Sequence, residues 1–162
     1  TFIRWRKGQR MPEGLNIAEQ VRVLRSSSNR EAYRALQSLQ ETSDVDDAVY
    51  VHIDSFIEMM RDSNSYVRTR GLTLIACNAK WDEAGKIDGI IDEYLEHVTD
   101  DKPITARQCI QSLPKLAEAK PHLMPRIVSS LRHADTSAYA DSMRSLVQDD
   151  IRDVLLALDS MQ

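Results

Sequence analysis

Apolar residues recur three and four positions apart along almost the whole chain, as they do on one face of an α-helix. The strict alternation of apolar and polar residues that marks a β-strand is missing. The pattern predicts an all-α fold of nine short helices joined by tight turns. Their expected ranges are 16–26, 29–41, 47–60, 66–79, 87–98, 104–119, 123–131, 137–147 and 149–160.

Particular residues mark where several of these helices begin. Ser28 and Glu31 have the spacing of a capping box, in which the hydroxyl accepts a hydrogen bond from a first-turn N–H group. Asp46 is expected to cap the next helix, and Pro103 fits a first helical position, where its missing N–H is not needed. Pro114 lies inside a predicted helix and is expected to kink or locally break it.

The helical pattern repeats along the chain. Leu36, Leu74 and Leu113 occupy corresponding positions that are 38 and 39 residues apart, and the apolar positions around them agree. A period of this length with two helices in each unit is typical of stacked helical hairpins. The sequence therefore predicts an α-α superhelix over residues 16–162, with about four hairpins and a C-terminal capping helix.

Residues 1–15 are predicted to form a separate basic arm. The first ten residues include Arg4, Arg6, Lys7 and Arg10 and no acidic residue, whereas the remaining residues carry a net charge of −8. The whole chain carries a net charge of −4, which disfavours a general nucleic-acid binder. Met11 is a candidate start of the natural protein, which would make residues 1–10 an added sequence.

Two stretches carry a resemblance to a known repeat family. The segment from Asp62 to Arg68, followed by Gly71, is similar to the inter-helix turn and second helix of a HEAT repeat. The segment from Asp101 to Arg107 is similar in the same way. The resemblance implies a HEAT-like solenoid in which Asp62, Arg68, Asp101 and Arg107 form a hydrogen-bonded ladder between neighbouring repeats.

The implied ladder is internal only, because Leu24 and Asp141 stand where the first and last repeats need an Asp and an Arg. A narrower resemblance links residues 66–82 and 103–121 to small bacterial HEAT-repeat proteins sometimes labelled SufBD-related. That label implies an accessory role in iron–sulfur assembly. Cluster scaffolding needs several convergent thiolates, whereas Cys77 and Cys109 are the only cysteines and Cys77 lies on a core-facing row.

The sequence carries no signature of catalysis. It contains no Gly-rich phosphate loop, no GxSxG, no HExxH and no CxxC, so neither enzyme activity nor a cofactor is expected. Glu93, His97 and His133 fall on neighbouring surfaces of the predicted repeats, but we interpret them as solvated polar residues rather than a metal site. The acidic cluster of Asp149, Asp150 and Asp153 is interpreted as the favourable start of a helix.

The family resemblance also indicates where a partner would bind, because the second helices of HEAT arrays line the concave surface. Repeat equivalence selects the rows expected to be exposed there. The predicted partner-binding residues are Arg34, Thr69, Leu72, Thr73, Gln108, Gln111, Ser112 and Arg144. Such a groove is polar and nearly neutral, which suits a peptide or helix of another protein better than DNA. The outer helices instead carry acidic residues, at positions 54, 58, 92, 93 and 96.

These observations favour a non-catalytic, cytoplasmic protein-interaction module, an adaptor or accessory protein whose partner is another protein. No apolar run reaches the roughly 18 residues that a membrane span needs. One alternative is a DNA-lesion enzyme similar to the HEAT-like alkylpurine glycosylases, whose concave face is basic and lined by aromatic residues. The chain offers Arg34, Arg70, Lys115 and Arg144 for this role, but no aromatic residue on the predicted exposed rows. A self-associating structural solenoid is the other alternative.

Overall fold

Every regular element of residues 16–162, the part of the chain that the computed structural model describes, is a helix. The α-helices are α1 (Ile17–Val23), α2 (Asn29–Val45), α3 (Ile53–Met60), α4 (Ser65–Cys77), α5 (Lys86–Gly89), α6 (Ile91–Glu96), α7 (Pro103–Ala119), α8 (Met124–Arg132) and α9 (Asp141–Ser160). Short 3₁₀ turns cover Asp47–His52, Ala79–Trp81, His97–Thr99 and Pro121–Leu123. The predicted all-α class is confirmed, and the predicted basic arm, residues 1–15, lies outside the described residues.

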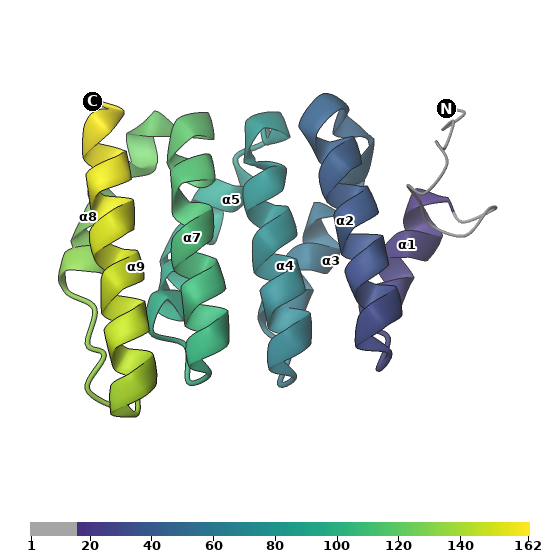
Figure 1. Ribbon diagram of the computed structural model, residues 1–162. Coiled ribbons are helices and arrows are strands. Elements are labelled where there is room, and N and C mark those ends of the chain that lie inside the picture. Colours follow the sequence, from purple (N-terminus) through teal and green to yellow (C-terminus); the bar gives the residue numbers. More distant parts are fainter. Residues whose placement is uncertain (1–15) are drawn as a thin grey trace.

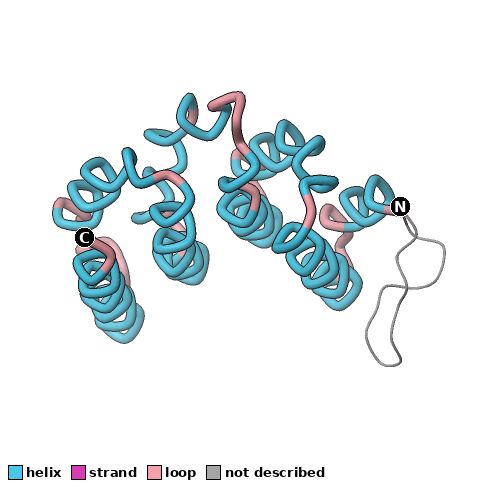
Figure 2. The backbone as a smooth tube through the Cα atoms, turned by 90° about the horizontal axis from the view of Figure 1, so that it is seen from above, coloured by secondary structure: helices cyan, strands magenta, loops and turns pink. Residues whose placement is uncertain are grey.

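The helices form two layers. Helices α2, α4, α7 and α9 stand side by side in chain order as a row of nearly parallel helices, and the shorter helices lie behind them (Figure 1). Seen from above, both layers follow an arc, and the row of four longer helices forms its inner side (Figure 2). Helix α4 packs against α3 and α7, and α7 packs against α9. Each inner helix therefore contacts its neighbours in the row as well as the outer layer.

Local capping explains where the inner helices begin. The Ser28 Oγ accepts a hydrogen bond from the Glu31 N–H at 3.3 Å, as predicted for the start of α2. Asp46 accepts from the Ala48 N–H at 2.7 Å and starts the following 3₁₀ turn. Pro103 is the first residue of α7, as predicted, and α7 continues past Pro114 to Ala119, so Pro114 does not end the helix.

Some of the predicted helix ranges are wrong. The expected helix 87–98 is divided at Ile90 into α5 and α6. The expected helices 137–147 and 149–160 are a single helix, α9, so the C-terminal capping helix does not exist as a separate element. The aspartates at positions 149, 150 and 153 consequently lie inside α9 rather than at a helix start. Asp150 instead accepts hydrogen bonds from Arg107 (2.6 Å) and Gln111 (3.2 Å) of α7. A contact between distant parts of the chain therefore explains this acidic residue.

The core lies between the two layers. Helix α4 approaches α3 so closely at Gly71 that an added Cβ would lie 2.7 Å from the Phe56 carbonyl oxygen. Tyr94 of the outer layer is fully buried, and its hydroxyl donates to the Leu72 carbonyl oxygen at 2.9 Å. Cys109, on the buried face of α7, is also fully buried. The inner helices are thus held to the outer layer by close packing and by satisfied buried polar groups.

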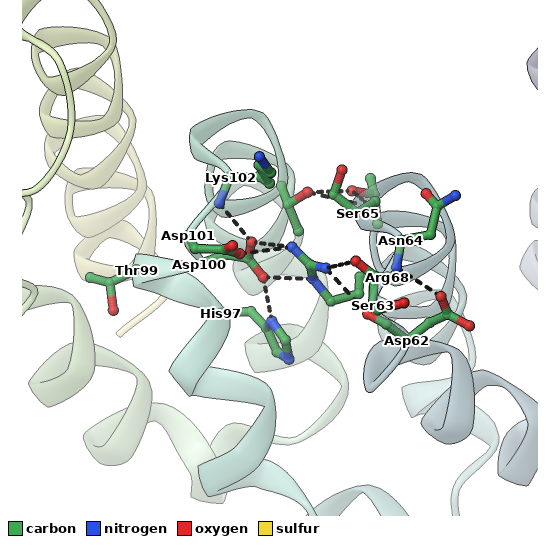
Figure 3. Close-up of polar contacts among 12 residues, drawn as sticks. Asp62, Ser63, Asn64, Ser65, Arg68, His97, Thr99, Asp100, Asp101 and Lys102 are labelled. Carbon is green, nitrogen blue, oxygen red and sulfur yellow. Dashed lines mark hydrogen bonds and ion pairs between the residues drawn. The ribbon is translucent and has the colours of Figure 1, made fainter.

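A buried polar network joins α4 to the turn before α7 (Figure 3). Arg68 donates to the Asp100 carboxylate through Nε (3.0 Å) and Nη2 (2.7 Å), and to Asp101 at 2.9 Å. The Asp100 carboxylate also bonds to His97 Nδ1 at 2.7 Å and accepts from the Lys102 N–H at 2.9 Å. Because Arg68 and Asp100 are buried, these bonds compensate the loss of hydration of both charges.

The pairs of the ladder differ from those that the family resemblance implies. The Asp62 side chain pairs with Arg25 at 3.4 Å rather than with Arg68. Arg68 bonds to this turn only through the main-chain carbonyl oxygens of Asp62 and Ser63. Arg107 pairs with Asp150 rather than with Asp101. Arg25, Arg68 and Arg107 therefore each pair with an acidic residue farther along the chain, and the pair formed by Arg25 was not predicted.

The Asp100 network predicts a loss of stability in acid. Burial alone would raise the pKa of Asp100, but hydrogen bonds from His97, Arg68 and the Lys102 N–H outweigh it and hold that pKa well below its usual range. The carboxylate therefore stabilises the fold above the unfolded-state pKa of about 4, and this contribution is lost as the pH falls below that value. We expect the urea midpoint to fall between pH 6 and pH 3, and to fall less steeply in Asp100→Asn. An equal slope in both proteins would contradict the assignment.

Candidate functional site

A groove of about 990 Å³ runs across the inner face, over the N-terminal halves of α2, α4 and α7. Its walls come from three parts of the chain that lie about 35 residues apart in sequence, so only the stacking of the inner helices creates it. The residues that line it are Asn29, Arg30, Tyr33, Leu36, Gln40, Ser65, Tyr66, Thr69, Arg70, Thr73, Lys102, Pro103, Ile104, Thr105 and Gln108.

Large apolar side chains are exposed in this groove. Tyr33, Tyr66 and Ile104 are 58%, 60% and 59% exposed, respectively. Two aromatic residues are therefore exposed on the inner face, outside the rows that were predicted to be exposed there. The spacing of Tyr33 before Leu36 predicts that Tyr33 faces the core, but Ala32 and Ala35 take the buried positions of α2 and leave Tyr33 outside.

The floor of the groove is made of threonines whose hydroxyls are already bonded. Thr69 Oγ1 donates to the Ser65 carbonyl oxygen at 2.8 Å and lies 2.9 Å from Thr105 Oγ1. Thr73 Oγ1 donates to the Thr69 carbonyl oxygen at 2.9 Å. Because these hydroxyls are satisfied within the protein, the floor offers few strong hydrogen-bonding groups to a ligand. Recognition must then come mainly from the walls.

The charged residues that line the groove are all cationic. Arg70 is buried beneath the wall, where it donates to the Leu24 carbonyl oxygen (2.8 Å) and to Asn29 (3.0 Å). Burial lowers the pKa of Arg70, and the Tyr66 ring lies 6.0 Å from its guanidinium carbon. Arg30 and Lys102 are exposed at opposite sides, on α2 and just before α7. No acidic residue belongs to the lining among residues 16–162.

The structure brings only some of the predicted partner-binding residues together. Thr69, Thr73 and Gln108 line the groove. Leu72 is fully buried and cannot contact a partner, so its assignment to an exposed row is wrong. Helix α4 is covered by inner helices on both sides and by α3 from behind, so the buried face of α4 is wide. Leu72 lies within that buried face.

The other predicted residues lie on the inner side but outside this groove. Arg34 and Gln111 are exposed, and Gln111 donates to Asp150. Ser112 is half-buried and bonds to the Tyr94 hydroxyl at 2.6 Å. Arg144 folds back onto its own segment and donates to the Tyr139 carbonyl oxygen at 2.8 Å. Arg144 and Ser112 are therefore engaged within the protein.

The sequence signal that could have located the walls is the pair Tyr66 and Ile104. These residues are 38 positions apart, equal to the repeat, and each is the second residue of an inner helix. On the surface of each helix they lie away from the buried face, which includes Leu74 in α4 and Leu113 in α7. A repeated apolar position that does not belong to the core is a sign of a functional surface.

The titratable clusters elsewhere are engaged in the fold. Glu93 pairs with Arg61 at 2.7 Å and His97 with Asp100, so the three residues weighed as a metal site do not converge. Within residues 16–162, no three His, Cys, Asp or Glu side chains are placed to hold a metal ion. Burial raises the pKa of the Cys109 thiol, which keeps it protonated and unreactive.

A second buried charge cluster, on the outer side, is also structural. Lys120 reaches Asp82 at 3.1 Å and Asp88 at 2.7 Å, and the Tyr50 hydroxyl bonds to Asp82. Asp82 in turn accepts from the N–H groups of Lys86 and Ile87 and so caps the start of α5. Each group has a partner that the fold requires, so the cluster does not present a free acid or base.

Comparison of the chain with known proteins finds no matching family model, no similar curated protein and no similar solved structure. None of the helices in residues 16–162 combines the length and the apolar character needed to cross a membrane.

Proposed function

We propose that residues 16–162 form a HEAT-like α-solenoid that serves as a non-catalytic protein-interaction module in the cytoplasm. Its partner is another protein, a segment of which binds in the groove across α2, α4 and α7. The observation that carries this proposal is the exposure of Tyr33, Tyr66 and Ile104 on three successive inner helices around one groove. Isolated exposed apolar residues are ordinary, but a cluster around a groove is typical of an interaction site.

The solenoid interpretation is supported by contacts that recur at the repeat distance. The Trp81 indole donates to the Ser43 carbonyl oxygen, 38 residues earlier, and Lys120 contacts the Asp82 carbonyl oxygen, also 38 residues earlier. Thr69 and Thr105, which face each other, are 36 residues apart. Neighbouring hairpins therefore meet through equivalent positions, as in a one-dimensional stack of repeats.

A binding role fits this surface better than catalysis does. The lining includes no histidine, cysteine or carboxylate in the described part of the chain, so the groove offers no general base or acid with a pKa suited to neutral pH. Its aromatic and aliphatic walls with a satisfied polar floor match a surface that anchors apolar side chains of a peptide or helix. Tyr and Ile side chains of this kind supply contact area rather than chemistry.

Site-specific photo-crosslinking tests the proposal. A photoreactive phenylalanine analogue is placed at Tyr66, at Ile104 and, as a control, at Val51, which is 76% exposed on the outer layer. In the cells that produce the protein, positions 66 and 104 are expected to yield the same protein adduct, and position 51 none. The alanine substitutions Tyr66→Ala and Ile104→Ala should each weaken that complex by roughly tenfold.

The proposal fails if the same adduct forms equally at the outer position, or if groove adducts contain nucleic acid instead of protein. The second outcome would favour the nucleic-acid alternative, because aromatic side chains beside cations also stack single-stranded bases. Melting temperatures of the two alanine variants are measured beside that of Val51→Ala, so that a loss of binding is not confused with unfolding.

A further inference from the structure

We propose that the segment bound in the groove is acidic, an Asp- or Glu-rich peptide stretch that also carries apolar side chains. This inference rests on the proposed function, because it describes what the same groove selects. It follows from the charges that line the groove, from the polarity of the helix ends at its edge, and from the apolar walls between them.

The two exposed cations of the groove have no partner within the described chain. Arg30 and Lys102 lie on opposite sides of the groove, and neither side chain forms an ion pair or hydrogen bond with another residue of the range 16–162. Two other cations of the inner face are neutralised: Lys115 pairs with Asp44 at 3.1 Å and Arg107 with Asp150 at 2.6 Å. The unpaired positive charge at the groove is therefore available to a bound anion.

The net charge of the whole protein is opposite in sign to the charge at the groove. The chain carries a net charge of −4, and the acidic side chains of the outer layer at positions 54, 58 and 92 are each paired with a cation. The two unpaired cations of the groove therefore form a local positive site on a protein of negative net charge. Potentials arranged in this way direct a charged partner toward one surface and raise its rate of association.

The helix ends at the groove edge add to the positive field. Asn29, Ser65 and Pro103, the first residues of α2, α4 and α7, all line the groove, so three helix N-termini lie along it. Each N-terminus carries a partial positive charge. Lys102 precedes α7 without a side-chain cap, which leaves the first-turn N–H groups of Ile104 and Thr105 without a side-chain acceptor. Because Ile104 is exposed, a carboxylate of the partner can accept from its N–H in addition to pairing with Lys102.

The apolar walls favour a peptide over a nucleic acid. Tyr33 and Tyr66 could stack bases, but Leu36, Pro103 and Ile104 occupy the rest of the walls and complement aliphatic or aromatic side chains. A nucleic acid also carries one charge per nucleotide, and its binding needs more clustered cations than the two free ones here. A segment with a few carboxylates spaced between apolar residues satisfies both the walls and the charges.

Peptide selection on the full chain tests this. A random peptide display library is selected on the wild-type protein, on Arg30→Glu/Lys102→Glu, and on Arg22→Glu/Arg132→Glu. The last variant has the same change in net charge at two exposed cations outside the groove. All four positions are exposed, so each variant should melt close to the wild type.

Peptides from the wild type and the control should be enriched in Asp and Glu together with apolar residues. Their association rate with the groove variant should be at least about tenfold lower, with a weaker dependence on salt.

The variant Ile104→Asp places a charge in the apolar wall. Binding to this variant distinguishes a failure of the acidic-segment inference from a failure of the proposed function. If the selected peptides lose binding to Ile104→Asp but show no acidic enrichment, the groove binds peptides and the acidic-segment inference is wrong. If no selected peptide depends on Ile104, both are wrong. If a labelled oligothymidine competes for the groove more tightly than any selected peptide, the ligand is a nucleic acid and the inference is overturned.

Discussion

Replacing Asp100 with alanine is expected to lower the free energy of unfolding by about 3 kcal/mol. The substitution leaves the Arg68 guanidinium, whose side chain is only 10% exposed, without the carboxylate that receives its Nε and one Nη2 bond. Removing one member of a buried ion pair typically costs about 3–5 kcal/mol, because the remaining charge is uncompensated. The lower end of that range applies, since Arg68 keeps its bonds to Asp101 and to the Asp62 and Ser63 carbonyl oxygens.

The network around Asp100 also explains why the loss should be global rather than local. Asp100 connects α4, through Arg68, to the turn that starts α7, through the Lys102 N–H. Its own carbonyl oxygen accepts from the Tyr139 hydroxyl in the segment that precedes α9. One residue therefore links α4, the turn before α7 and the segment before α9, so its removal weakens contacts on both sides of α7.

Urea unfolding followed by circular dichroism measures the effect, with Arg25→Ala as the matched control. Arg25 and Asp62 form another arginine–aspartate pair of the fold, but their side chains are 46% and 29% exposed. An exposed pair of this kind contributes at most about 1 kcal/mol. Equal losses in Asp100→Ala and Arg25→Ala would contradict the assignment of a buried, energetically important network.

The helix starts were predictable because capping is local. Ser28 and Pro103 act through atoms within one helical turn, and the sequence presents these residues directly. The continuity of α9 was not predictable in this way. Asp150 belongs to an acidic cluster of the kind that often starts a helix. Only its distant partner Arg107 explains why it lies in the middle of one.

The groove was predictable only in part, because the phase of a helix depends on what surrounds it. The three-residue spacing of Tyr33, Leu36 and Leu39 is that of an apolar stripe, so the pattern alone places Tyr33 toward the core. Ala32 and Ala35 fill the buried side of α2 instead, and Tyr33 turns outward into the groove.

Leu72 was misplaced for the opposite reason. Repeat equivalence with Arg34 and Gln111 placed Leu72 on an exposed row, which assumes that each inner helix buries a stripe of the same width. Helix α4 has α2 and α7 on its flanks and α3 behind it, so its buried face is wider than that of a surface helix. The central position of α4 in the row, which only the assembled structure reveals, therefore decides the burial of Leu72.

The close approach at Gly71 makes this glycine the second sensitive position. In Gly71→Ala the new Cβ would lie 2.7 Å from the Phe56 carbonyl oxygen, 2.8 Å from the Met60 nitrogen and 2.9 Å from the Met59 Cβ. Two of these atoms are backbone, so no side-chain rotation relieves the contact, and α3 must move away from α4. Overpacking of this severity costs up to about 3 kcal/mol. The better helix propensity of alanine returns at most about 1 kcal/mol, which leaves a net loss of about 2 kcal/mol.

Gly89→Ala provides the matched control, because it introduces the same methyl group at another helical glycine. No atom lies within 4 Å of an added Cβ at Gly89, and its φ is not in the left-handed region. That variant should unfold at the same urea concentration as the wild type or at a slightly higher one. A Gly71→Ala protein as stable as Gly89→Ala would mean that α3 and α4 are farther apart than described. Because α4 carries Tyr66 and Thr69, their spacing from the neighbouring helices, and hence the shape of the groove, depends on the same contact.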